Sequence, residues 1–406
     1  MKSSKVNISK GILGSVYSRI LVILFAISLL SPFLANDIPL YTFQGGKHYF
    51  PVFGSIMPGL FPNTEGINWQ NKAEWGEFFI MPPIPYHSRS IDLDNAPFIH
   101  PFENQNIKNW RYRHWLGTDD LGRDVLAGLL HGSTVSLVIG VLATLIAVLT
   151  GIFIGGIAGF LGDDQYRPTL AKLISFTGAF FTLIIFAIGW FDAGILRWTT
   201  MSLLILICST IYFLGSRILE KIPVLRKHLT IPVDLFTLRI IETMRSIPDL
   251  FLIIGLAAII DAPGIFTLVF LIAFLRWPVI ARYVRAEMLK VRSQDYITYA
   301  RGTGLPRRTV FWKYALPNAL TPVWVLAAFS VAIAILLESS LSFLGIGIPV
   351  EWVTWGSMLN LSRRSLEAWH LAIFPGLAMF AVIYFFNTLG EKLEHDLRGS
   401  EGQAEI

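Results

Sequence analysis

Long apolar stretches separated by shorter polar ones are the main pattern of this chain. A helix that crosses the bilayer's hydrocarbon core of about 30 Å needs about 20 mostly apolar residues. Eight stretches come close to this requirement: residues 16–35, 133–161, 173–190, 200–213, 247–260, 266–281, 319–343 and 370–389. The pattern therefore predicts an all-α, polytopic membrane protein with about eight transmembrane helices.

The first apolar stretch has a second interpretation. Lysines precede it and a small residue, Ala35, ends it, which is also the arrangement of a cleaved signal peptide. Its length, together with the lack of a well-formed small-x-small cleavage site, favours a first transmembrane helix that is retained.

Basic residues in the polar stretches predict the orientation. Residues 282–313 contain eight basic and two acidic side chains, and loops of this kind lie in the cytoplasm. Counting the spans outward from this loop places both termini and the basic stretch 217–227 in the cytoplasm. The polar residues 37–115 are then expected on the outer side of the membrane.

Composition agrees with this picture. Of the 406 residues, 53% are hydrophobic and 15% are charged, whereas soluble domains average about 25% charged residues. The net charge of +5 comes from Lys and Arg residues that flank apolar stretches. It therefore indicates membrane topology rather than nucleic-acid binding.

Metal and cofactor chemistry is limited in this sequence. The single cysteine, Cys208, excludes an intrachain disulfide and a cysteine-based metal site, and the eight histidines show no metal-ligand spacing. No stretch matches G-x-x-x-x-G-K-[ST], the loop that cradles phosphates. We expect the chain to bind no metal or cofactor itself, so any ATP must be bound by another chain.

Three glycines in the second apolar stretch, Gly151, Gly155 and Gly159, recur every four residues. This spacing places them on one face of a helix, where the missing side chains let another helix approach closely. They form the predicted helix-packing site.

A short helix is predicted at residues 295–304, Asp-Tyr-Ile-Thr-Tyr-Ala-Arg-Gly-Thr-Gly. Asp295 is expected to cap its N-terminus, and Gly304 to take the left-handed conformation just beyond its C-terminus. With Leu316-Pro317 twelve residues after the glycine, this stretch resembles the EAA loop of ABC importer permeases.

The resemblance implies that this helix docks into a groove of a cytoplasmic ATPase and transmits its movement. The expected docking residues are Asp295, Tyr296, Tyr299, Ala300, Arg301, Gly304, Leu316 and Pro317. The sequence departs from the family's Glu-Ala-Ala core, which is Thr298-Tyr299-Ala300 here and lacks the acidic residue. A basic loop that only sets the topology is the alternative.

Residues 116–126, Leu-Gly-Thr-Asp-Asp-Leu-Gly-Arg-Asp-Val-Leu, are similar to the G-T-D-x-x-G-R-D-V-L signature of dipeptide and oligopeptide permeases. Thr118 or Asp119 is expected to cap an interfacial helix before the second span. The D-x-D-x-D-G order of a calcium loop is absent. A purely structural role is the alternative for this motif.

Other stretches resemble the same branch. Residues 338–347, with Trp355-Gly356 and Pro375-Gly376, are similar to its E-A-x-L-S-F-L-G-x-G, W-G and P-G series. Residues 35–40 and 49–52 resemble the outer segment of the subfamily linked to longer peptides and microcin C.

Glu338 is the clearest ionisable residue inside a predicted span. Helical spacing places it on one stripe with Leu341, Ser342 and Gly345. Because a charge facing lipid is costly, we predict that this stripe faces the translocation path. A buried hydrogen bond from Glu338 to a neighbouring helix is the alternative.

The resemblance implies the fold of a type I ABC importer permease, a six-helix core to which this chain adds an inserted pair. The expected organisation is a cytoplasmic N-terminus (1–15), a first transmembrane helix (16–36), a periplasmic segment (37–115), an interfacial helix and second transmembrane helix (116–165), an inserted transmembrane pair with a basic linker (166–232), the permease core (233–391) with the EAA-like loop at 282–318, and a cytoplasmic C-terminus (392–406).

The function implied is that of a non-enzymatic permease subunit in the bacterial inner membrane, importing di- and oligopeptides, with microcin C-like peptides included. The implied partners are a second permease subunit, two ATPase subunits that hold ATP and magnesium, an extracytoplasmic solute-binding protein and membrane lipid, and no nucleic acid.

Other functions were weighed against this one. Nickel-chelate importer permeases share the same motifs, so they remain an alternative. A secondary transporter usually carries several ionisable residues inside its spans, whereas Glu338 is the clearest one in this chain, so this function is disfavoured. A membrane enzyme is not supported, because neither a Ser/His/Asp set nor an H-E-x-x-H motif is present.

Overall fold

The structure is a computed structural model of the chain, and it describes residues 16–44, 46–56, 78–107, 109–163, 166–179, 182, 198–258, 264–346, 349, 352–365 and 367–404. Expectations for residues 1–15, and for most of the second half of the predicted span 173–190, lie outside these residues. The chain divides into two compact units. The first comprises Met1–Phe153, Thr243–Val284 and Leu316–Ile406, and the second comprises Ile154–Glu242 and Arg285–Ala315.

Within the described residues, five helices are long and apolar enough to cross a membrane. They are α5 (Val125–Leu161), α7 (Trp198–Leu219), α10 (Ile265–Arg292), α14 (Val323–Phe343) and α16 (Trp369–Ala404). Shorter apolar helices are α2 (Val16–Leu29) and the helix Leu170–Ala179. The prediction of an all-α polytopic membrane protein is confirmed.

Pro248 separates two helices at the start of the predicted span 247–260. Helix α8 (Val233–Arg245) ends before Pro248, and α9 (Asp249–Ala257) begins after it. Proline has no backbone N–H to donate and disfavours the helical conformation of the residue before it, so a break is expected here. The nine residues of α9 rise roughly 14 Å, too little to cross the hydrocarbon core alone.

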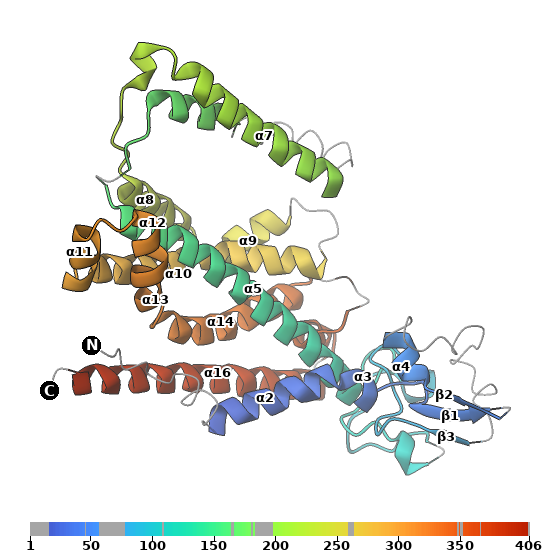
Figure 1. Cartoon of the computed structure of the whole chain (residues 1–406). Coiled ribbons are helices and arrows are strands. Elements are labelled where there is room, and N and C mark those ends of the chain that lie inside the picture. Colours follow the sequence, from blue (N-terminus) through green and yellow to red (C-terminus); the bar gives the residue numbers. More distant parts are fainter. Residues whose placement is uncertain are drawn as a thin grey trace. The chain divides into compact units, whose positions relative to one another are not determined.

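In the first unit, α5, α9, α10 and α14 share an apolar core that includes Ile139, Ile253, Leu268, Ile272 and Leu341. Helix α16 lies beside α14 and α2, and the short helix α15 (Trp355–Ser362) packs against both α14 and α16 (Figure 1). The apolar residues of α5 and α14 are spread over all faces, as is expected of helices buried in a bundle or in lipid.

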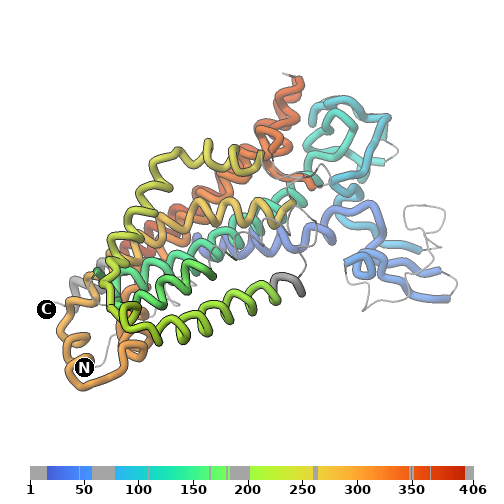
Figure 2. Tube along the Cα trace, turned by 90° about the horizontal axis from the view of Figure 1, so that it is seen from above, coloured from blue at the N-terminus to red at the C-terminus, as the bar shows by residue number. Residues whose placement is uncertain are grey.

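The described part of the polar segment is folded. After α3 (Ser31–Leu34), strands β1 (Tyr41–Gln44), β2 (Lys47–Tyr49) and β3 (Phe78–Ile80) form an antiparallel sheet in the order β2-β1-β3. Helix α4 (Pro51–Ile56) and the 3₁₀ turns η3 (Leu93–Asn95) and η4 (Trp110–Tyr112) complete it. Figure 2 shows these blue and cyan elements gathered at one end of α2.

The expected interfacial helix before the second span is absent, and the expected cap was wrong. Helix α5 begins at Val125 and continues to Leu161. Asp124 caps it, because its Oδ1 accepts the backbone N–H of Ala127 at 2.7 Å. Residues 118–124 form a turn instead, since Thr118 hydrogen-bonds to the polar segment and Asp119 to Leu121 and Arg123.

The second unit contains the end of α5, the helix Leu170–Ala179, α7, η5 (Pro223–Arg226), α8, the end of α10, α11 (Asp295–Gly302), α12 (Arg307–Thr309) and the π-helix η6 (Val310–Ala315). The described parts of the inserted pair, 170–179 and α7, lie side by side (Figure 1). A Cβ on Gly215 of α7 would lie 3.1 Å from Oγ of Ser175, and Lys172 pairs with Glu220 at 3.5 Å.

Two of the three predicted packing glycines lie directly against α10. In the first unit, a Cβ on Gly151 would lie 2.7 Å from Cγ2 of Ile280. In the second unit, a Cβ on Gly159 would lie 2.7 Å from the carbonyl oxygen of Arg285. Gly155 is buried. No larger side chain fits at Gly151 or Gly159 without movement of α10.

Candidate functional site

Helix α11 forms the part of the second unit to which the sequence assigns a docking role. Its N-cap is Gln294, so the expected cap at Asp295 was wrong, and Asp295 lies in the first turn. There its negative charge is favourable for the helix dipole. At the other end, Gly304 has a φ of +78°, the left-handed conformation in which glycine avoids the steric cost of a side chain.

The two faces of α11 differ in exposure. Ile297 and Ala300 are buried and pack inward. Tyr296 and Tyr299 lie on the outer face, and Tyr299 is 77% exposed. The outer face of α11 therefore presents two aromatic side chains to the surroundings of the second unit.

The inner side of the α11 loop contacts the end of α5. The guanidinium carbon of Arg301 lies 5.2 Å from the ring centroid of Phe160, a cation–π arrangement. Phe311 of η6 packs on the same Phe160 ring at 5.1 Å. Burial lowers the pKa of Arg301, and the charges of Arg292 and Arg307 lower it further. Arg301 and Phe311 thus connect the α11 loop to the end of α5.

An ion pair and a hydrogen bond connect α8 to the end of α10 and to the residues that follow α5. Asp234 of α8 accepts two hydrogen bonds from the guanidinium of Arg285, and Asp163 accepts the backbone N–H of Leu235 at 2.9 Å. The paired carboxylate and guanidinium are both largely buried, so breaking the pair would leave an uncompensated charge.

The last two predicted docking residues belong to the first unit. Leu316 and Pro317 begin the short helix α13 (Leu316–Ala319), where Leu316 is buried and Pro317 is exposed.

In the first unit, Glu338 is fully buried at the centre of a hydroxyl cluster. Its Oε2 accepts hydrogen bonds from Ser136 of α5 at 2.9 Å and from Ser339 at 3.2 Å, and its Oε1 accepts one from Ser342 at 2.8 Å. Gly356 of α15 lies against Ser339 and Ser342. These contacts correspond to the hydrogen-bonding alternative for Glu338 and tie α14 to α5.

The four residues of the predicted stripe have two different environments, and the change occurs between Leu341 and Ser342. Leu341 is buried in the apolar core with Glu338 nearby. Ser342 and Gly345 line a cavity of about 200 Å³, which Arg123 and Asn360 also line. The C-terminal half of the stripe therefore borders this cavity, whereas Glu338 and Leu341 are fully buried.

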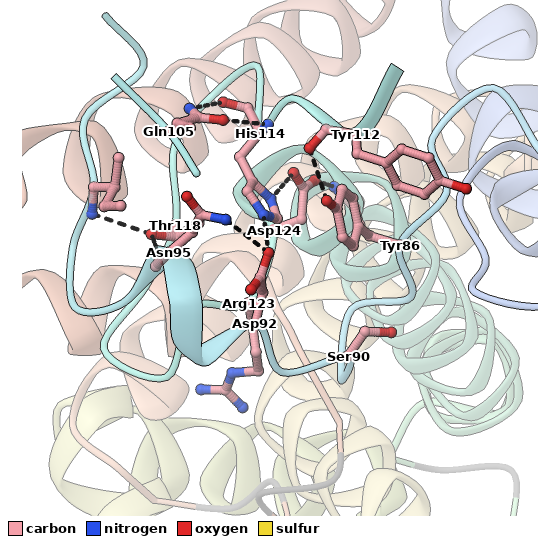
Figure 3. Close-up of polar contacts among 12 residues, drawn as sticks. Tyr86, Ser90, Asp92, Asn95, Gln105, Tyr112, His114, Thr118, Arg123 and Asp124 are labelled. Atoms are coloured by element: carbon pink, nitrogen blue, oxygen red, sulfur yellow. Dashed lines mark hydrogen bonds and ion pairs between the residues drawn. The ribbon is translucent and has the colours of Figure 1, made fainter. Parts of the chain in front are cut away.

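A second polar cluster surrounds His114, which is completely buried (Figure 3). Its Nδ1 lies 2.8 Å from Asp124 and its Nε2 lies 3.2 Å from Asp92. The ring of Tyr86 stacks on it with centroids 4.2 Å apart, and Gln105 exchanges two hydrogen bonds with its backbone. The cluster anchors the polar segment to the start of α5.

These contacts shift two pKa values in opposite directions. Burial alone would lower the pKa of His114, but the hydrogen bonds and charges of Asp124 and Asp92 raise it above its usual value. Burial alone would raise the pKa of Asp92, but hydrogen bonds from Asn95 and His114 lower it. His114 is therefore favoured as an imidazolium held between two carboxylates.

Neither His114 nor Arg276, a residue of α10 that is only 7% exposed, was predicted from the sequence. The partners of His114 come from 10 and 22 residues away, so no local pattern indicates the cluster. Arg276 did leave a signal, because it lies inside the predicted span 266–281, where an ionisable residue indicates function by default.

Comparison with known proteins finds one family match and several similar proteins. Residues 228–399 match the binding-protein-dependent transport system inner membrane component. The inner membrane ABC transporter permease YejE of Escherichia coli (strain K12) is 26% identical over 380 residues, 92% of this chain and 89% of its own length.

Two further relatives extend this similarity. A putative peptide permease of Brucella suis biovar 1 (strain 1330) is 28% identical over 317 residues, 76% of this chain and 78% of its own length. The dipeptide transport system permease DppC of Bacillus subtilis (strain 168) is 27% identical over 286 residues, 70% and 68% of the two chains.

These matches confirm the resemblance in the motifs and the interpretation of the chain as a multi-pass transport subunit rather than an enzyme. Permeases of this kind bind no cofactor of their own. The chain is therefore similar to the inner membrane component of binding-protein-dependent transport systems over residues 228–399, and to peptide and dipeptide permeases over most of its length.

Proposed function

We propose that this permease forms half of the membrane pathway of a peptide importer and that α11 is the element by which an ATPase drives it. The exposed Tyr299 on α11 carries the proposal for the docking site, since the opposite face of the same helix contacts α5 through Arg301 and Phe160. Tyr296, Asp295 and Gly304 complete the outer surface of this loop.

The importer needs further chains. One α11 loop serves one ATPase, so a symmetric ATPase pair requires a second permease with its own loop. The two ATPase subunits would bind ATP and magnesium. A solute-binding protein would deliver peptide to the folded polar segment that contains β1, β2 and β3.

The proposed orientation places α11 and both termini in the cytoplasm. The basic residues of 282–313 favour this side. The polar segment 37–115 then lies outside the membrane, where a solute-binding protein would reach it.

Peptides are the proposed substrates. Two of the reported relatives are named for peptides and dipeptides, and a glutathione transport permease of Pectobacterium atrosepticum is 27% identical over 310 residues. These names favour peptides over nickel chelates. Residues 35–40 and 49–52 favour longer or microcin C-like peptides within this class.

The pathway proposal concerns Ser342 and Gly345, which border the 200 Å³ cavity. Glu338 and Leu341, both buried, support these positions from within the helix bundle.

Purification of the tagged chain from a strain that also expresses its neighbouring genes tests the assembly. We expect a second permease and two ATPase subunits to co-purify in mild detergent. In proteoliposomes with ATP and the binding protein, labelled tripeptide should accumulate and unlabelled peptide should compete. A homodimer of this chain that transports peptide alone would contradict the assembly, and competition by nickel-histidine but not by peptide would contradict the substrate.

A further inference from the structure

Arg276 is a buried cation inside the membrane-spanning helix α10. It follows Ile265, the first residue of α10, by eleven positions, which is roughly 16 Å along the helix and about half of the hydrocarbon thickness. The residue is only 7% exposed. Within the described part of the chain its Nε has no hydrogen-bond partner, and none of the ion pairs includes it.

A small cavity of about 150 Å³ lies beside Arg276. Pro248 and Pro278 line it, so both of its helical walls are interrupted by proline. Pro278 has no N–H for the carbonyl one turn earlier, and Pro248 separates α8 from α9. Pro278 therefore leaves one carbonyl without its helical N–H partner, and the N–H groups that begin α9 follow directly after Pro248.

The charges around the cavity favour an anion. Arg245 and Asp249 also line it and are the charged groups that act on Arg276. Two guanidinium groups against one carboxylate leave a net positive charge. The N-terminus of α9, with its partial positive charge, begins at Asp249 on the same cavity.

We infer that Arg276 binds the carboxylate of a peptide during passage through the membrane. This inference rests on the proposed function as a peptide importer. A guanidinium presents paired N–H donors that match the two oxygens of a carboxylate, and burial strengthens their attraction. The cavity has room for a carboxylate and a few further atoms, which suits the C-terminal end of a peptide.

Uptake of trialanine and of trialaninamide by the reconstituted complete importer tests this inference. The two peptides differ only in the C-terminal carboxylate. In Arg276→Gln we expect uptake of trialanine to fall at least about tenfold, the effect of losing a hydrogen bond to a charged group. Uptake of trialaninamide should change less than about twofold. Arg276→Lys, which keeps the charge but loses the fork of donors, should give an intermediate loss for trialanine alone.

The binding protein is the same in every variant, so its own preference between the peptides cancels in the comparison. Arg239→Gln is the matched control, because Arg239 is an exposed arginine on α8 that pairs with Glu242 outside the cavity. It should leave uptake of both peptides unchanged. Equal losses of both peptides in Arg276→Gln would overturn the inference and assign Arg276 to a structural partner. Absence of uptake in the wild-type importer would instead contradict the proposed function.

A measurement on the wild-type importer covers the case in which the variants do not assemble. Phenylglyoxal modifies arginine, and mass spectrometry of peptides containing Arg276 reports the extent of modification. During ATP turnover, trialanine should slow this modification and trialaninamide should not. Equal rates with both peptides, or no modification in any nucleotide state, would overturn the inference.

Discussion

The Nδ1 atom of His114 lies 2.8 Å from Oδ2 of Asp124, while Oδ1 of the same carboxylate caps α5 by accepting the N–H of Ala127. One carboxylate thus joins the folded polar segment to the first turn of a membrane-spanning helix. Movement of the polar segment would therefore be transmitted to α5 through a buried and charged contact.

This contact predicts a pH dependence of stability. Because folding raises the pKa of His114, its stabilisation is fully present below the unfolded pKa of about 6.5 and is lost as pH rises through the folded value. Folding lowers the pKa of Asp92, whose contribution is present above about 3.9 and is lost as pH falls through its folded value. The melting temperature of the purified importer should therefore fall by a few degrees as pH rises above about 6.5 and through the folded pKa of His114.

His114→Gln should remove most of that alkaline decrease, measured by detergent melting at several pH values. His395→Gln is the control, since His395 is exposed in α16 and lies outside the cluster. An unchanged slope in His114→Gln would show that the buried imidazolium does not cause the pH dependence.

Gly304→Val should uncouple the ATPase from transport. A β-branched residue at a φ of +78° is strained by more than the roughly 1–2 kcal/mol that other L-residues pay there. The end of α11 would shift, although a Cβ at this position meets no atom of the chain within 4 Å. We expect normal membrane insertion, peptide uptake at least about tenfold lower, and ATP hydrolysis that no longer responds to substrate.

Gly304→Asn separates strain from bulk, because asparagine tolerates the left-handed conformation far better than valine. It should retain most of the uptake. Normal substrate-stimulated hydrolysis and uptake in Gly304→Val would contradict the docking role of α11.

Gly151→Ala should destabilise the packing of α5 against α10. Its Cβ would lie 2.7 Å from Ile280 and 2.9 Å from the backbone nitrogen of Ala281. Moving the backbone of α10 to relieve this contact costs free energy. Overpacking of this kind costs about 1–3 kcal/mol. Gly178→Ala adds the same methyl group where no atom lies within 4 Å, so detergent melting should show a loss for Gly151→Ala only. Equal melting temperatures would refute the close packing.

The sequence predicted those features that follow from local chemistry. The lengths of the apolar stretches identified α5, α10, α14 and α16, because a segment that crosses lipid must be a continuous apolar helix whatever its neighbours are. The left-handed conformation of Gly304 was also predictable, because the end of a helix commonly requires this conformation and glycine adopts it most readily.

Features decided by distant residues were not predictable. Thr118 is a good capping residue by type, but its hydroxyl donates to the carbonyl of Asn95 and accepts from the N–H of Ile99. Asp124 therefore caps α5 in its place. The carboxylate that the sequence assigned to the path, Glu338, likewise finds Ser136 from a helix 202 positions earlier in the chain.

The cluster around Glu338 predicts different effects for two substitutions of the same residue. Glu338→Gln keeps the shape, and serine hydroxyls can rotate to accept as well as donate, so assembly and melting should stay close to wild type. Glu338→Leu leaves Ser136, Ser339 and Ser342 without this acceptor, at about 1–3 kcal/mol for each buried hydroxyl that finds no other partner. We expect lower melting and poor assembly for the leucine variant, with peptide uptake by the glutamine variant within about twofold of wild type. A large loss of uptake in a well-assembled Glu338→Gln importer would instead place the carboxylate itself on the path.

Ser342 decides whether this cluster borders the path. After Cys208, the single cysteine, is replaced by serine, Ser342→Cys can be exposed to a water-soluble thiol reagent in each nucleotide state of the importer. Ser342 is only 5% exposed but lines the 200 Å³ cavity, so labelling should be slow at rest and faster during turnover with peptide. Leu341→Cys is the matched control, because Leu341 is fully buried one residue away in the apolar core and should stay unlabelled. If Ser342→Cys resists the reagent in every state, the cavity is closed to water throughout transport and the pathway role of Ser342 and Gly345 is wrong.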